Sequence, residues 1–102
     1  MTLLDEEQSV LMAIDIQERL LKAVFNRTTL EQRASIMVKA ADILSIPVIV
    51  TEQYPNGLGK TVPSISDYLI SDKSKVFEKT AFSALNGSEI VSHLNELKKR
   101  QV

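Results

Sequence analysis

Cysteine is absent from this sequence, and its absence excludes several kinds of site at once. Without it there is no disulfide framework, no thiolate metal site and no thiol nucleophile within the 102 residues. No repeat, linker or low-complexity segment interrupts the chain either. Hydrophobic residues make up 44% and charged residues 25% of the sequence, which is typical of one ordinary globular α/β domain.

An excess of charge of one sign is also lacking. Twelve basic and thirteen acidic residues leave a net charge of -1, which argues against nucleic acid or an anionic membrane as a partner. No apolar run approaches the roughly 18 residues of a membrane span, and the acidic start at residues 1–8 is unlike a secretion signal. We therefore expect a cytoplasmic protein. The basic residues 98–100 follow an expected helix, where they would complement its dipole.

Three short segments have the character of buried strands. Residues 10–14 (VLMAI) form a continuous apolar run that is too short for a buried helix. Residues 47–51 (PVIVT) are apolar, β-branched and led by proline. A third, briefer strand is expected at residues 75–79.

Two helices are expected between the first two strands. Asp15 can cap a short helix reaching about Phe25, because Glu18 lies three residues later, as in a capping box. Thr29 and Gln32 indicate a second helix start. Its apolar residues recur at helical spacing, and the residues expected to face inward are Leu30, Ala34, Met37, Ala41 and Leu44.

The rest of the chain is expected to form a long loop and a last helix. Residues 52–67 contain Pro55, Gly57, Gly59 and Pro63, a composition that disfavours a regular helix or a central strand. Long ordered loops are often functional. Residues 88–99 are typical of an amphipathic helix, whose inward residues would be Ile90, Val91, Leu94 and Leu97.

This alternation predicts an α/β fold with a parallel sheet and right-handed crossovers. Ligands bind such sheets beyond the carboxyl ends of the strands. Asp15, Glu52 and Lys79 fall at or just after those ends. We therefore expect the carboxylate of Asp15 and the ammonium of Lys79 to lie close together at one edge of the sheet.

Two nucleotide-binding motifs are rejected, and no cofactor is expected. Gly59-Lys60-Thr61 lacks the glycine that a phosphate-binding loop needs five positions earlier, where Tyr54 stands. Val62 occupies the third glycine position of a dinucleotide fingerprint. No metal site is expected, because His93 is the only histidine and the ordinary interpretation is a residue at the edge of the core.

Each candidate side chain also has an ordinary structural interpretation. Asp15 could be a helix cap, which is compatible with a chemical role. Lys79 could be a solvated strand end, although Phe77 and Phe82 surround it with apolar surface and a buried ammonium would need a carboxylate partner. Tyr54 and Phe82 could line a pocket or belong to a satellite of the core.

Three separate blocks together resemble the isochorismatase-like cysteine hydrolase family, and most closely its isochorismatase-domain branch. The order and spacing of the blocks make the resemblance specific, and it spans nearly the whole chain. The blocks are residues 13–17 (AIDIQ), residues 47–55 (PVIVTEQYP) with 57–59 (GLG), and residues 79–84 (KTAFSA).

The resemblance implies a Rossmann-like, three-layer α/β/α fold with a six-stranded, mostly parallel sheet and a triad of aspartate, lysine and cysteine. Asp15 and Lys79 match the aspartate and the lysine. In amide-hydrolysing members the aspartate takes the thiol proton, and the thiolate attacks a carbonyl to give a thioester that water cleaves. Some vinyl-ether hydrolases in the family use the aspartate as an acid. The substrate-pocket candidates are Gln17, Glu52, Tyr54 and Phe82.

The family's fourth strand and its cysteine should begin around Val102, where this sequence stops. We therefore expect residues 1–102 to be the N-terminal part of a single domain, truncated after the third strand and its following helix, which would act on a small-molecule substrate if completed. The alternative is a non-catalytic oligomerising or binding module built on the half-fold. In either case the outer edge of the first strand is expected to be bare, which favours a homo-oligomer or pairing with the rest of the same chain.

Overall fold

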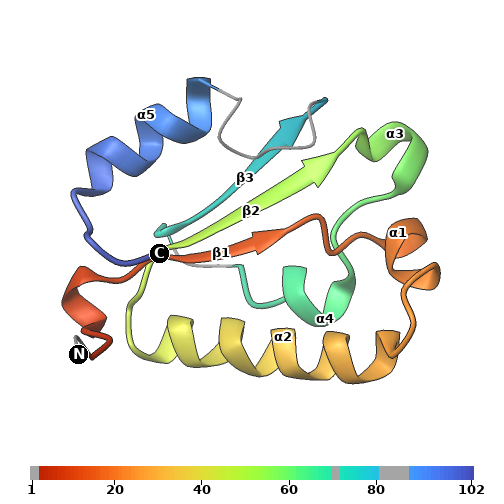
Figure 1. Cartoon of the computed structure of the whole chain (residues 1–102), viewed down its shortest axis with the longest axis horizontal. Coiled ribbons are helices and arrows are strands. Elements are labelled where there is room, and N and C mark those ends of the chain that lie inside the picture. The colour runs from red at the N-terminus through yellow and green to blue at the C-terminus, as the bar shows by residue number, and fades with distance from the viewer. Residues whose placement is uncertain (1–2, 70–71, 81–87) are drawn as a thin grey trace.

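A computed structural model describes residues 3–69, 72–80 and 88–102 of the chain. Its centre is a sheet of three parallel strands, β1 (Leu11–Ile14), β2 (Val48–Gln53) and β3 (Ser74–Lys79), in the order β1-β2-β3 (Figure 1). The predicted parallel α/β arrangement is confirmed. All three strands run in the same direction, so their carboxyl ends meet at one edge.

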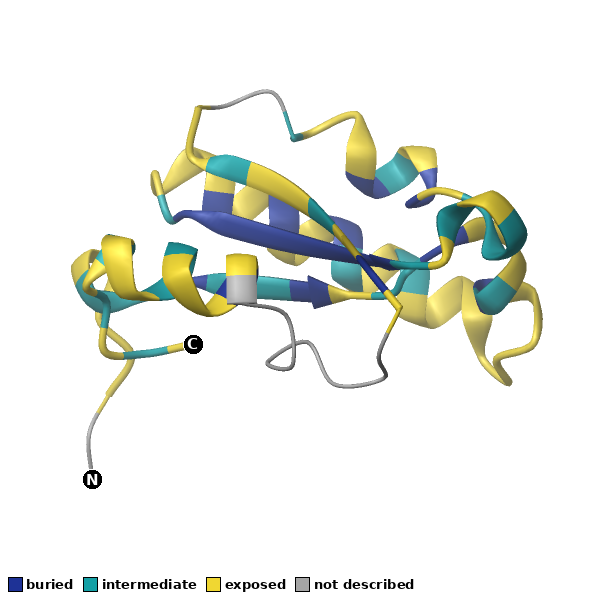
Figure 2. Cartoon of the chain, turned by 90° about the horizontal axis from the view of Figure 1, so that it is seen from above, coloured by how far each residue is buried: buried dark blue, intermediate teal, exposed yellow. Residues whose placement is uncertain are grey.

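The central strand β2 is the most deeply buried element (Figure 2). Its residues Val48, Ile49 and Val50 are at most 2% exposed, as expected for a parallel strand covered on both faces. It runs two residues beyond the predicted end at Thr51, because Gln53 still pairs with Lys79 of β3.

One face of the sheet is covered by α2 (Arg27–Ile43) and α4 (Pro63–Ser66). Ala41 of α2 packs with Ala13, Val48 and Val50 of the sheet. A second cluster joins α2 to α4 through Val38 and Ile65. Both clusters use small or branched side chains, which permits close packing of helix on sheet.

The predicted inward face of α2 is partly wrong. Ala41 is buried as expected, but Leu30, Met37 and Leu44 are 41%, 58% and 49% exposed, whereas Val38 is 1% exposed. Apolar residues occur on most sides of this helix, so their periodicity alone could not select the side that meets the sheet. The helix also begins two residues before the predicted Thr29, after Asn26 in a left-handed conformation.

The predicted cap of the first helix is also wrong. Asp15 has φ 57° and lies two residues before the N-cap of α1 (Glu18–Lys22), which is Gln17. The helix ends at Lys22, before the predicted Phe25. The first element in the described part of the chain is a 3-10 turn, η1 (Glu6–Gln8).

The segment at residues 52–67, predicted to be an irregular loop, contains two single-turn helices. These are α3 (Pro55–Leu58) and α4, and each has a proline in its first turn, where a missing N–H costs nothing. The interpretation of the prolines as breakers was therefore too strict. Pro55 and Pro63 are the first residues of these two helices.

Helix α5 (Ser88–Leu97) lies on the other face, beside β3. The rings of His93 and Phe77 are 5.5 Å apart between centroids. Ile90 is 2% exposed, as predicted, whereas Val91 is 37% exposed. The basic residues after α5 do not lie in its last turn, and Lys99 Nζ instead donates to the carbonyl oxygen of Glu7.

The outer edge of β1 is covered at its start by the end of the chain (Figure 1). Ser9 and Gln101 form a parallel bridge, and the N–H of Val10 donates to the Gln101 carbonyl at 2.7 Å. Beyond this bridge, no strand within the described ranges pairs with the outer side of β1. None of the helices in those ranges is both long enough and apolar enough to cross a membrane.

The orientation of α2 makes neighbouring residues differ in their contribution to stability. We predict that Val38→Ala lowers the free energy of unfolding by about 2 kcal/mol, through lost burial and a cavity. Met37→Ala should change it by less than about 0.5 kcal/mol, because that side chain is largely exposed. Urea denaturation measures both. A larger effect at Met37 than at Val38 would contradict this orientation of the helix.

Candidate active site

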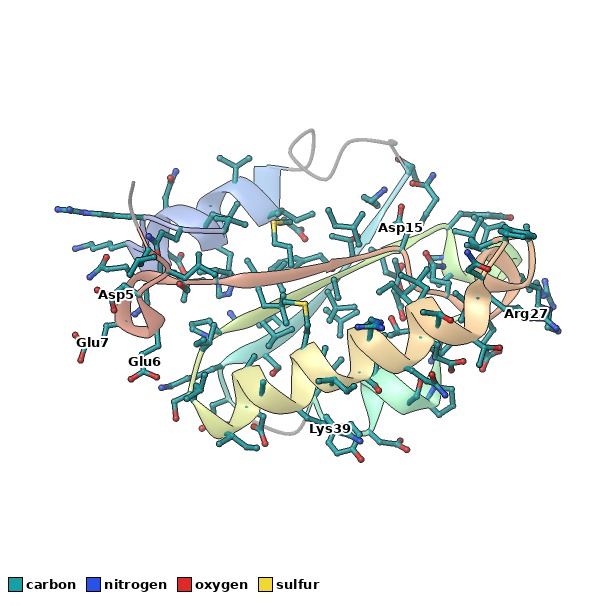
Figure 3. The ribbon with its side chains drawn as sticks, turned by 60° about the horizontal axis from the view of Figure 1, so that its bottom comes forward. Asp5, Glu6, Glu7, Asp15, Arg27 and Lys39 are labelled. Atoms are coloured by element: carbon teal, nitrogen blue, oxygen red, sulfur yellow. The ribbon has the colours of Figure 1, made fainter. Side chains whose placement is uncertain are left out.

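Asp15 follows directly after β1, where the chain turns sharply out of the sheet. Its φ of 57° lies in the left-handed region, which aspartate tolerates better than most residues. Its backbone N–H still donates to the carbonyl of Thr51 at 3.1 Å. The turn therefore begins at the carboxyl end of the strand, where Figure 3 labels Asp15.

The side chains of Asp15 and Lys79 form an ion pair across the ends of the three strands. Lys79 Nζ lies 2.9 Å from Asp15 Oδ2, and the side chains are 3% and 22% exposed. The expectation that these charges lie close together is confirmed. A buried ammonium needs an anion and further hydrogen bonds to offset its desolvation, and the carboxylate supplies the anion while keeping an edge open to solvent.

Two residues of β2 complete the surroundings of the pair, and sequence reasoning missed both. Thr51 Oγ1 donates to Asp15 Oδ1 at 2.8 Å, and Lys79 Nζ donates to Gln53 Oε1 at 2.9 Å. The two-residue repeat of a strand could have identified them, because Thr51 and Gln53 are two residues apart and their side chains therefore lie on the same face of β2. The neighbouring strands bring Asp15 and Lys79 to that same face.

Gln17 is fully buried and ties the end of β1 to the following loop. Its amide oxygen accepts from the N–H of Gln53 at 2.6 Å, and its amide nitrogen donates to the carbonyls of Gln53 and Gly59 at 3.0 and 2.6 Å. Gly59 has φ 86°, and a Cβ there would lie 3.3 Å from Glu18 Cβ. Gln17 thus holds the backbone beside the ion pair.

Glu52 lies on the opposite face of β2 from Thr51 and Gln53. Glu52 is 7% exposed, and its Oε2 accepts from both the N–H and the hydroxyl of Thr61, at 2.7 and 2.8 Å. The structure therefore does not bring Glu52 together with Asp15 and Lys79. It anchors the loop that leads to α4.

Tyr54 stands at the end of β2 in a left-handed conformation, with φ 40° and 56% exposure. Its N–H donates to the carbonyl of Lys79 at 3.0 Å, so the residue lies next to the ion pair in the sheet. Bulky residues rarely adopt this conformation, and it occurs at binding sites more often than elsewhere. Phe82, the remaining pocket candidate, lies outside the described residues.

A separate cavity of about 330 Å³ lies between β3 and α5 and does not include the ion pair. It is lined by Lys75, Phe77, Glu89, Ser92, His93 and Glu96. The His93 side chain is 11% exposed, and its Nδ1 lies 3.9 Å from Glu96 Oε2. Within the described ranges, no three histidine or acidic residues are arranged to hold a metal ion.

Comparison with protein families identifies the relatives of this fold. A model of the isochorismatase domain matches residues 9–102. The chain belongs to the isochorismatase family. Isochorismatase domain-containing protein 2 from Xenopus laevis is 42% identical over 82 residues, which are 80% of this chain and 38% of the frog protein.

Two solved structures show the same fold as this isochorismatase family chain. The MAR1 ribonuclease from Caenorhabditis elegans has a TM-score of 0.83 and 35% identity, over 90% of this chain and 47% of the nematode chain. The YcaC gene product from Escherichia coli, described as an octameric hydrolase of unknown specificity, has a TM-score of 0.84 and 19% identity, over 96% and 49%. The chain thus spans less than half the length of these relatives.

The ion pair predicts a characteristic pattern of stability. Asp15→Asn should lower the free energy of unfolding by roughly 3 kcal/mol, because it leaves the buried ammonium of Lys79 without its carboxylate. Adding Lys79→Met to that variant should recover about half of the loss. Thermal or urea unfolding of the two single variants and the double variant measures the coupling, with exposed Lys75→Met as control. Strictly additive costs would show that the two side chains do not interact.

Proposed function

We propose that the complete protein is a hydrolase that cleaves a small-molecule amide or a related C–N or vinyl-ether bond, with Asp15 and Lys79 as catalytic residues. The observation that carries this proposal is the 2.9 Å contact between the two side chains at the carboxyl edge of the sheet. Ligands bind parallel α/β sheets at that edge. Membership of the isochorismatase family supports the proposal further.

We propose that the nucleophile comes from chain that continues after Val102. Ser9 pairs with Gln101 in parallel. In a parallel pair of strands, each further residue of one strand is matched by one further residue of the other. Asp15 lies six residues after Ser9, so the position opposite it would lie about six residues beyond Gln101. A strand continuing along this edge would deliver its own carboxyl end beside Asp15, and the cysteine of the resembled family belongs after that strand.

In the proposed reaction, a carboxylate oxygen of Asp15 accepts the proton of the thiol, and the thiolate forms a bond to the substrate carbonyl carbon. The C–N bond then breaks, the amine leaves with the proton from Asp15, and water hydrolyses the thioester. Lys79 holds the carboxylate in place and supplies positive charge beside the developing anions. With a vinyl ether, Asp15 would instead act as the proton donor.

The four pocket candidates would serve this site in different ways. The amide of Gln17 and the Oε2 atom of Glu52 are hydrogen-bonded within the fold, so we propose that these two residues position the backbone around the pair. Tyr54 is exposed beside the site and is proposed to contact substrate. Phe82 is proposed to line the pocket on grounds of its sequence motif alone.

The substrate is proposed to be a small molecule rather than nucleic acid. The C. elegans relative is described as a ribonuclease, so RNA is the alternative substrate to test first. The net charge of -1 favours a small molecule. A homo-oligomer and a cytoplasmic location are proposed as well, and the octameric E. coli structure supports oligomerisation.

A non-catalytic oligomerising or binding module remains the second candidate function. The exposed apolar residues of α2, among them Ile36 and Ile43 at 62% and 80% exposure, favour it. Such a module would need the shape of the sheet but not the chemistry of the ion pair. Asp15 would then matter for stability alone.

Activity measurements on two lengths of chain test the proposed hydrolase. The 102-residue chain should not turn over nicotinamide, isochorismate or RNA, because it has no cysteine nucleophile and lacks the continuing strand that is proposed to complete the pocket beside Asp15. A chain extended through its natural downstream sequence should hydrolyse a small amide or vinyl ether, and Asp15→Asn should lower kcat/KM by a factor of about 10² to 10⁴.

The matched control for that experiment is Lys75→Met, which removes an exposed lysine from the same strand as Lys79. It should leave kcat/KM unchanged, whereas Lys79→Met should reduce it about as strongly as Asp15→Asn. Full activity of a folded Asp15→Asn variant would exclude the proposed role. An extended chain that cleaves RNA alone would exclude the proposed substrate class.

A further inference from the structure

Thr51 carries a buried hydroxyl group in the otherwise apolar part of β2, the central strand (Figure 2). It is 0% exposed, as are Ile49 and Val50 before it. A hydroxyl in such a place costs free energy unless it is hydrogen-bonded. Valine has the same branched shape without that cost, so the packing of β2 does not explain why a hydroxyl stands here.

The polar groups of Thr51 are directed at Asp15. Thr51 Oγ1 donates to Asp15 Oδ1 at 2.8 Å, and the carbonyl oxygen of Thr51 accepts from the N–H of Asp15 at 3.1 Å. Thr51 therefore holds both the side chain and the backbone of the residue that follows β1. A β-branched side chain has few χ1 rotamers, and full burial restricts this one further, so the position of its oxygen is well defined.

Lys79 by itself would not fix the direction of the Asp15 carboxylate. Its ammonium contacts Oδ2 from the end of a long, flexible side chain, and the terminal torsion of an aspartate is broad. A donor on one oxygen alone would leave the carboxylate free to rotate about that torsion. The donor on Oδ1 comes from a different strand, and the two contacts together fix the plane of the group.

Gln53 holds Lys79 in a corresponding way. Its Oε1 accepts from Lys79 Nζ at 2.9 Å, while its Nε2 donates to the carbonyl oxygen of Thr80 at 3.0 Å. The second bond fixes the orientation of the amide with its oxygen toward the ammonium. Since Thr51 and Gln53 are alternate residues of one strand, β2 supplies a hydrogen-bond partner to each member of the ion pair.

We propose that Thr51 is a positioning residue, whose hydroxyl holds the Asp15 carboxylate in the orientation that accepts the thiol proton. This inference rests on the proposed hydrolase function of Asp15. Proton transfer needs its donor and acceptor within hydrogen-bond distance, and a displacement of about 1 Å can lower a rate about 10²-fold. A water molecule in place of the hydroxyl would satisfy the partly exposed carboxylate but would not fix its direction.

Two substitutions at Thr51 separate the hydroxyl from the packing of the side chain, in a chain extended through its natural downstream sequence. Thr51→Val keeps the branched shape and should lower kcat about 10- to 100-fold, with KM within about twofold of the parent value. Thr51→Ser keeps the hydroxyl and should leave kcat within about threefold of the parent value. The thermal unfolding midpoint of Thr51→Val should fall by no more than about 4 °C, because the packing is retained.

Ser35→Ala is the matched control, because it also removes a buried hydroxyl. Ser35 is 9% exposed on α2, and its Oγ donates to the carbonyl oxygen of Gln32 at 2.8 Å, on the opposite face of the sheet from Thr51. Its kcat and KM should equal those of the parent. A folded Thr51→Val variant with the parent kcat, or a Thr51→Ser variant as slow as Thr51→Val, would overturn the proposal.

The NMR signal of the Asp15 carboxyl carbon measures the same contact without any activity. In an extended chain with labelled aspartate, this signal should shift on Thr51→Val and stay near the parent position in Thr51→Ser and Ser35→Ala. A signal that Thr51→Val does not move would overturn the positioning role. An extended chain that shows the expected shifts but hydrolyses neither an amide nor a vinyl ether would instead contradict the proposed hydrolase.

Discussion

The charge of Lys79, whose side chain is 3% exposed, is the constraint on which the carboxyl edge of the sheet depends. An ammonium group removed from water is stable only where an anion and oriented dipoles replace its hydration. Asp15 provides the anion and Gln53 an amide oxygen, and each comes from the end of a different strand. The pair therefore couples β1 to β3 across β2, and the left-handed turn at Asp15 is what brings its carboxylate into this position.

The surrounding polar residues hold the backbone at that edge through hydrogen bonds that do not involve the side chains of Asp15 or Lys79. Gln17 binds backbone groups at Gln53 and Gly59, and Glu52 binds Thr61 from the other face of β2. The start of α1 and the loop before α4 are thus attached to the strand ends by buried hydrogen bonds, which lose free energy if either partner is removed. In the proposed hydrolase, Asp15 would therefore be a pre-positioned acid or base with one edge open to solvent, as proton transfer requires.

Most of the parallel sheet and the approach of Asp15 to Lys79 could be predicted from the sequence. Short apolar runs that end in polar residues show where the strands lie, and their alternation with helices indicates that the strands are parallel. The family resemblance added the prediction that Asp15 and Lys79 correspond to the aspartate and the lysine of the family's triad. The role of Asp15 as a cap could not be judged correctly, because an aspartate after a strand suits a cap and a left-handed turn equally well. The inward side of α2 was missed because the helix carries exposed apolar residues as well as buried ones. Thr51 and Gln53 were missed because their role depends on register between strands.

The central claim is that Lys79 is a buried ammonium held by Asp15, and NMR of the lysine side chains tests it most directly. In a sample with labelled lysine nitrogen, the Lys79 ammonium should be protected from exchange with water, and its resonance should move on Asp15→Asn substitution. The exposed Lys75 serves as an internal reference with rapid exchange. A Lys79 ammonium that exchanges as fast as that of Lys75, or one unaffected by Asp15→Asn, would contradict the account.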